Sequence, residues 1–145
     1  MGTKFGRLAL AAATILTGLG VAALPAAPAH AGTTCVFSMV SLEAQNLQKD
    51  NGSATDYVWV QVDKTWFPAG GNGIAFRLFD LRNASSFGNP SMGFGTSIDV
   101  RVVLDEWPLN VTVERESFAC SAVTNGVRTF SNGDAQYRMV YSVTT

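Results

Sequence analysis

Strict alternation of apolar and polar residues is the feature that most restricts how this chain can fold. Successive side chains of a β-strand point to opposite faces, so alternation places one set toward a core and the other toward solvent. The clearest run is residues 57–62, where Val58, Val60 and Val62 share one face, and residues 137–143 repeat the pattern. No amphipathic helix of similar clarity follows residue 31, so the pattern predicts an all-β protein.

Turn residues divide this alternating sequence into short segments. Residues 69–73 (Ala-Gly-Gly-Asn-Gly) form a turn, and Asn125-Gly126 and Asn132-Gly133 are typical of β-hairpins. About eight short strands, separated by roughly 8 to 15 residues, predict an antiparallel β-sandwich, with a small barrel as the alternative.

The first 31 residues are typical of a helical export signal. Lys4 and Arg7 precede a mainly apolar run, residues 8–24, and Ala29-His30-Ala31 is a small-residue cleavage pattern. A membrane anchor is the alternative, but this Ala- and Gly-rich run ends in a cleavable site. We therefore expect a signal peptide (1–31), a single secreted, extracellular domain (32–145) and no membrane span in the mature chain.

Charge argues against nucleic acid as a partner. Loss of Lys4 and Arg7 from the 10 basic residues leaves eight against 11 acidic residues, a net charge of −3 for the mature chain. The remaining basic residues are spread along the sequence and form no stripe of the kind that binds phosphates.

The only two cysteines, Cys35 and Cys120, both follow the predicted cleavage site. In an oxidising exterior such a pair predicts a disulfide, with two separate buried thiols as the alternative. A bridge that closes about 85 residues restricts the unfolded chain by roughly 4 to 5 kcal/mol in the entropy model.

Several catalytic chemistries are excluded by residue counts. His30 is the only histidine and leaves with the signal peptide, so a histidine-dependent triad or zinc site has no ligand. Oxidised cysteines provide no thiolate nucleophile. A carboxylate pair, Glu114 and Glu116, would be required for glycoside hydrolysis, but their context is typical of a solvated strand face. The sequence therefore predicts no enzyme.

Two other groups of residues are binding candidates. The Gly-rich segment 82–96 carries Phe87, Met92 and Phe94, which either fold back onto the core or, with Trp107, contact a partner. Folding back is the favoured interpretation. Exposed aromatic residues can also stack on sugar rings, and the candidates are Tyr57, Trp59, Trp66 and Trp107; core packing is the more common fate of tryptophan.

Acidic residues in predicted turns raise the alternative of a calcium site. The candidates are Asp50, Asp56, Asp105 and Glu106, which would have to converge from two loops at one end of the sandwich. Asp is also a residue that turns prefer, so ordinary turn chemistry is favoured, and no cofactor is expected.

Short segments resemble C2-like β-sandwich modules of secreted bacterial proteins. They are TDYVWV (55–60), KTWFP (64–68), IDVRVVLDE (98–106) and the closing strand 137–143. The Ala- and Pro-rich signal is similar in style to those of actinomycetes. The resemblance implies a sandwich; a denser acidic cluster would be expected where this chain has Asp105-Glu106-Trp107-Pro108, so it gives little support to calcium binding.

These observations favour a secreted, non-catalytic β-sandwich that binds an unknown protein, glycan or surface. A small secreted toxin or enzyme inhibitor is the second hypothesis, and a carboxylate-based glycoside hydrolase is the third.

Overall fold

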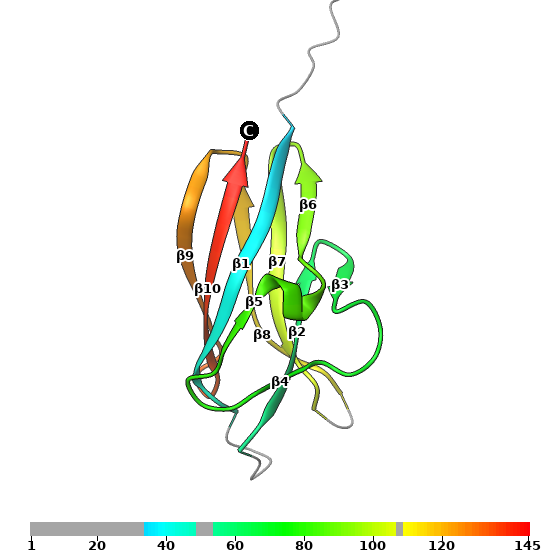
Figure 1. The fold of residues 1–145 in the computed structure, drawn as a ribbon, viewed down its shortest axis with the longest axis vertical. Helices are drawn as coiled ribbons and strands as arrows, with labels where there is room; N and C mark the ends of the chain where they lie inside the picture. Colours follow the sequence, from blue (N-terminus) through cyan, green and yellow to red (C-terminus); the bar gives the residue numbers. More distant parts are fainter. Residues whose placement is uncertain (1–33, 49–53, 107–108) are drawn as a thin grey trace, which may run out of the picture. The chain divides into compact units, whose positions relative to one another are not determined.

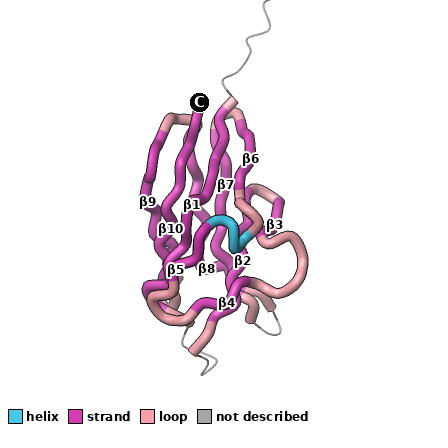
Figure 2. The backbone as a smooth tube through the Cα atoms, in the orientation of Figure 1, coloured by secondary structure: helices cyan, strands magenta, loops and turns pink. Residues whose placement is uncertain are grey.

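The computed structural model describes residues 34–48, 54–106 and 109–145, all of which fall within one compact unit, Ala31–Thr145. The predicted signal peptide lies outside the described residues. Figures 1 and 2 show that strands dominate this part of the chain, with a single short helix, η1 (Ala84–Phe87). The strands are β1 (Cys35–Asn46), β2 (Asp56–Val62), β3 (Thr65–Phe67), β4 (Ile74–Phe76), β5 (Leu81–Asn83), β6 (Ser91–Phe94), β7 (Ser97–Leu104), β8 (Val111–Ala119), β9 (Val123–Ser131) and β10 (Gln136–Thr144).

Two antiparallel sheets form the predicted sandwich. Sheet A has the order β5-β1-β10-β9, with β6 also pairing with β1. Sheet B has the order β3-β2-β7-β8, with β4 also pairing with β2. The described residues form ten strands rather than about eight, partly because β5 and β6 extend sheet A from the segment that was predicted to be a loop.

Alternation places the core as predicted. Val58, Val60 and Val62 of β2 are fully buried, and so are Tyr137 and Met139 of β10. The alternate residues of β2, such as Tyr57, lie on the outer face of sheet B.

Segment 82–96 folds back onto the core, which is the interpretation that the sequence favoured. Phe87 of η1 is fully buried, and its ring centroid lies 6.0 Å from that of Phe76. Met92 and Phe94 of β6 are partly buried and pack against the same core. As a correction, the binding candidate Phe87 is a core residue with no surface to offer a ligand, because pairing of β5 and β6 with β1 holds η1 beside the middle of β1.

The two Asn-Gly pairs have different outcomes. Asn132-Gly133 forms the β9–β10 turn as predicted, and the Asn132 side chain accepts hydrogen bonds from the backbone N–H groups of Asp134 and Ala135. Asn125-Gly126 is not a hairpin turn; it lies inside β9 at a bulge, where the register with β10 shifts. A Cβ on Gly126 would lie 2.7 Å from Cζ of Tyr141, so this glycine makes room for the tyrosine ring.

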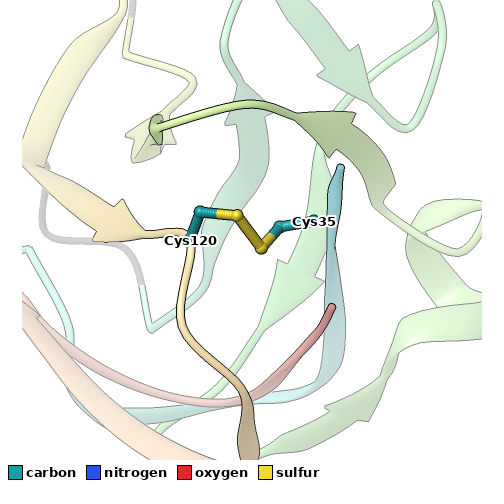
Figure 3. Close-up of a disulfide and its surroundings, with 2 residues drawn as sticks. All are labelled: Cys35 and Cys120. Carbon is teal, nitrogen blue, oxygen red and sulfur yellow. A yellow bond between two sulfur atoms is a disulfide. The ribbon is translucent and has the colours of Figure 1, made fainter. Parts of the chain in front are cut away.

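The predicted disulfide joins the two sheets. Cys35 begins β1 in sheet A, and Cys120 directly follows β8 in sheet B, with 5.5 Å between their Cα atoms (Figure 3). Extracellular proteins commonly carry such bonds, so the disulfide is consistent with an extracellular protein.

A buried hydrogen bond also crosses between the sheets. The Tyr137 hydroxyl of β10 donates to Oδ2 of Asp56 in β2 at 2.6 Å, and the same oxygen accepts the backbone N–H of Gln48 at 3.0 Å. Asp56 is 3% exposed, so these donors satisfy a carboxylate that water barely reaches.

At each edge of the sandwich, an arginine of sheet A contacts residues of sheet B. Arg82 of β5 lies 5.9 Å from the Phe76 ring centroid and donates to the backbone oxygen of Ala75 in sheet B. At the other edge, Arg128 of β9 lies 5.6 Å from the ring centroid of Phe118 in sheet B. The two sheets are therefore tied at both edges as well as through the disulfide and the buried hydrogen bond.

Candidate binding site

The outer face of sheet B carries a group of exposed aromatic side chains. Val58 pairs with both Ile74 and Leu104, so β4 and β7 lie on opposite edges of β2, and β3 lies on the same edge as β4. Trp66 of β3 is the register partner of Gln61 and shares the outer face with Tyr57 and Trp59. Tyr57 and Trp66 are 45% and 39% exposed, which places aromatic surface in contact with solvent.

Trp59 and Trp66 form one corner of an open pocket. Their ring centroids are 6.2 Å apart and their planes meet at 82°, an edge-to-face arrangement. The cavity has a volume of about 270 Å³ and is lined by Trp59, Trp66, Pro68, Gly70, Gly71 and Asn110. We call this set of residues the aromatic pocket.

Local structure holds the pocket walls in place. Val103 is the register partner of Trp59, so alternation along β7 places it on the outer face, where it is only 2% exposed. Gly73 fits against the backbone of β2, because a Cβ at this position would lie 2.7 Å from the Val58 nitrogen. The loop that carries Pro68 is therefore held close to the strand that carries Trp59.

A second cavity lies beside the first along β2. It has a volume of about 410 Å³ and is lined by Thr55, Tyr57, Ala75, Arg77, Asp80 and Arg82, which we call the basic pocket. Asp80 accepts hydrogen bonds from Nη2 of Arg82 and from the backbone N–H of Arg77, both at 3.0 Å. Within the described ranges, the exposed Arg77 guanidinium forms no ion pair with an acidic residue.

Sheet B also carries an ion pair elsewhere on this face. Arg115 of β8 donates to Oδ2 of Asp99 in β7, and its guanidinium holds the pKa of that carboxyl below its ordinary value. The pair is solvated, so it leaves the aromatic region as the distinctive part of the face.

The predicted binding loop does not reach the aromatic pocket. Met92 and Phe94 line a separate cavity of about 240 Å³, together with residues of β7, while Phe87 belongs to the core. Trp107 lies outside the described residues, so its predicted binding role stays a prediction.

The calcium candidates do not form a cluster among the residues that the structure describes. Asp50 lies outside the described residues, and Asp56 is engaged by Tyr137 and Gln48. Asp105 and Glu106 follow β7. Among the residues that the structure describes, no group of three or more acidic, histidine or cysteine side chains is placed to hold a metal ion.

The acidic residues near Tyr137 affect its titration. Burial, the hydrogen bond to Asp56 and the negative charges of Asp56 and Glu106 together raise the pKa of Tyr137 well above its ordinary value.

The carboxylate pair on β8 has structural partners. Oε2 of Glu114 accepts the backbone N–H of Ser131 at 2.8 Å, and Oε2 of Glu116 lies 3.6 Å from Nη1 of Arg128. Both partners belong to β9 of sheet A, so the two glutamates join the sheets at this edge. Glycoside hydrolysis instead needs two carboxyl groups that flank the scissile bond of a bound sugar.

Comparisons with known proteins add no family. No protein-family model matches the chain, and no curated protein matches its sequence. In the described part of the chain, no helix combines the length and apolar character that crossing a membrane requires.

Sequence reasoning identified part of this site. Alternation with buried valines predicts that Tyr57 and Trp59 point away from the core, and Trp66 was a candidate for sugar stacking. Reasoning from sequence missed Asn110 and Arg77. The glycine-rich sequence after Pro68 predicts a tight loop, but it does not indicate that this loop forms a wall of the pocket.

Proposed function

We propose that the mature chain is a secreted, non-catalytic binding module that binds carbohydrate at the aromatic pocket. The observation that carries this proposal is the edge-to-face pair of Trp59 and Trp66 in an open pocket on a sheet surface. Tryptophan side chains in defined pockets dominate the binding energy of many interfaces. Such residues in a soluble domain would otherwise be expected in the core.

The lining of the pocket suits a sugar ring. A pyranose has an apolar face of C–H groups and a rim of hydroxyls. The indole faces match the first, while the Asn110 amide and the nearby backbone can exchange hydrogen bonds with the second. A purely apolar ligand would form no hydrogen bond with the Asn110 amide, and a protein partner with a flat surface would not fill a concave site.

Export is part of the same proposal. A Lys/Arg-containing start, an apolar run and a small-residue cleavage pattern precede the described residues, and the disulfide suits an oxidising exterior. The toxin or inhibitor hypothesis has less support, because the segment expected to be its exposed loop is paired with β1.

Isothermal titration calorimetry with uncharged probes tests the proposal. Cellohexaose, dextran and fully methyl-esterified hexagalacturonate would be titrated into the mature protein. We expect measurable binding of at least one probe, and a loss of about thirtyfold in affinity for Trp66→Ala, the value for a hot-spot side chain. Trp66 is preferred to Trp59 because it lies on an edge strand and is more exposed, so its removal perturbs the fold less.

Val127→Ala is the matched control, since Val127 is exposed on β9 of the other sheet. Its affinity should equal that of the parent protein, and urea unfolding should show that both variants are folded. If no carbohydrate probe bound, uncharged or charged, or if Trp66→Ala bound as tightly as the parent, the aromatic pocket would not be a carbohydrate site.

A further inference from the structure

The two pockets are lined by neighbouring residues on one face of β2. Tyr57 lines the basic pocket and Trp59 lines the aromatic pocket. They are two residues apart on the same face, so their Cα atoms are separated by about 6.7 Å. A ligand longer than one sugar ring that rests on Trp59 and Trp66 can therefore extend over Tyr57 toward Arg77.

The basic pocket has one cation whose charge is not balanced. Asp80 is compensated by the ion pair with Arg82 at 3.0 Å and by the Arg77 backbone N–H. Arg82 is also fixed by its hydrogen bond to the Ala75 oxygen and by its position over the Phe76 ring. The Arg77 guanidinium, by contrast, is exposed and makes no ion pair within the described residues, so it is available to an anion.

Shape and charge together define the ligand class. We propose that the carbohydrate is anionic, and that Arg77 binds a carboxylate or sulfate ester on the sugar unit next to the one held by Trp59 and Trp66. The inference rests on the carbohydrate-binding function proposed above. Guanidinium groups suit this role because their planar N–H donors pair with two oxygens of such a group.

The net charge of the mature chain would not by itself favour an anionic ligand. With a net charge of −3 after the predicted cleavage, the mature chain repels polyanions at long range. Selection of an anionic glycan therefore has to come from a local group, and Arg77 is the cation that the basic pocket offers.

Matched pairs of charged and uncharged glycans test the inference. Hexagalacturonate and its fully methyl-esterified form share one backbone and differ in charge, and dextran sulfate and dextran provide the same contrast for sulfate esters. Calorimetry at pH 7 in 50 mM and 500 mM NaCl would give each affinity. We expect at least one charged form to bind tenfold or more tighter than its uncharged partner at low salt, with a smaller ratio at high salt.

Three variants locate the effect. Arg77→Gln should remove the preference while retaining the affinity for the uncharged form, and Arg77→Lys should restore part of the preference. Lys64→Gln is the control, because it removes the same charge from the exposed β2–β3 turn and lines neither pocket. It should leave the preference unchanged.

The outcomes separate this inference from the proposed function. Equal affinity for charged and uncharged forms, or a preference that survives Arg77→Gln, would overturn the anionic assignment while Trp66-dependent binding remained. Absence of binding to every probe would overturn the carbohydrate proposal, and the inference with it. A preference for dextran sulfate alone, or for hexagalacturonate alone, would support the inference and identify the anionic group.

Discussion

Replacing Tyr137 with phenylalanine removes the hydroxyl that joins the two sheets through Asp56. The hydroxyl is buried, and it donates to a carboxylate oxygen at 2.6 Å. Hydrogen bonds to charged groups contribute about 1.5 to 3 kcal/mol to stability, so Tyr137→Phe should lower the free energy of unfolding by that amount at pH 7. Urea unfolding followed by tryptophan fluorescence measures the difference.

The same substitution should change how stability depends on pH. Burial, which is the largest cause, and the negative charges beside the ring raise the pKa of Tyr137 in the folded protein above the value of 10.0 that applies to an unperturbed side chain. A group with a raised folded-state pKa contributes stability that is fully present below the unfolded-state pKa and is lost as the pH rises. Above pH 10 the unfolded chain releases this proton while the folded chain retains it.

The magnitude follows from linkage. Each pH unit above 10 should lower the free energy of unfolding by about 1.4 kcal/mol through Tyr137 alone, so the contribution at pH 11 is also about 1.4 kcal/mol. Tyr137→Phe lacks this loss, and the stabilities of the two proteins should therefore converge between pH 9 and pH 11. Tyr57→Phe is the control because Tyr57 is exposed on the outer face of sheet B. Parallel pH profiles for the parent and Tyr137→Phe would refute the reasoning.

Two other predictions about the stability of the sandwich can be tested by urea unfolding. Removing the disulfide with Cys35→Ala and Cys120→Ala should cost about 4 to 5 kcal/mol, because 85 residues separate the two cysteines, and a loss below 1 kcal/mol would contradict the entropy argument. Gly126→Ala should cost about 1 to 3 kcal/mol, because its Cβ would lie 2.6 Å from Cγ1 of Val123 and 2.7 Å from a ring atom of Tyr141. Gly95→Ala, whose Cβ would meet nothing within 4 Å, should be close to neutral, and similar effects of the two would show that these side chains do not restrict position 126.

Fold prediction succeeded where a local pattern determines the structure. Alternation in residues 57–62 follows from the pleat of a single strand, and the Asn132-Gly133 turn follows from the conformations those two residues allow. Asn125-Gly126 is the same dipeptide with a different outcome, because it lies within β9, where Gly126 is the register partner of Tyr141 in β10. That pairing joins positions 15 residues apart in sequence, and no local propensity contains it.

The site was less predictable, for a related reason. Alternation alone places Trp59 outside the core. The basic pocket requires β5 of sheet A to bring Arg82 beside β4 of sheet B, and the order of strands in two sheets cannot be obtained from their individual patterns. The composition around Phe87 left two alternatives open, exposure and folding back, and the favoured one occurs because pairing of the flanking segments buries the ring.

The arrangement of the frame explains why a binding surface would lie on the outer face of sheet B. The inner faces are occupied by the core, and the edges are closed by Arg82 and Arg128. The strands of sheet A, as far as the structure describes them, carry no aromatic side chain on their outer face. Trp59 instead lies on a central strand of sheet B, beside its buried register partner Val103 and in edge-to-face contact with Trp66. A ligand that binds there does not have to order the protein, and this preorganisation lowers the entropic cost of binding. The same ties that stabilise the sandwich therefore also favour the proposed function.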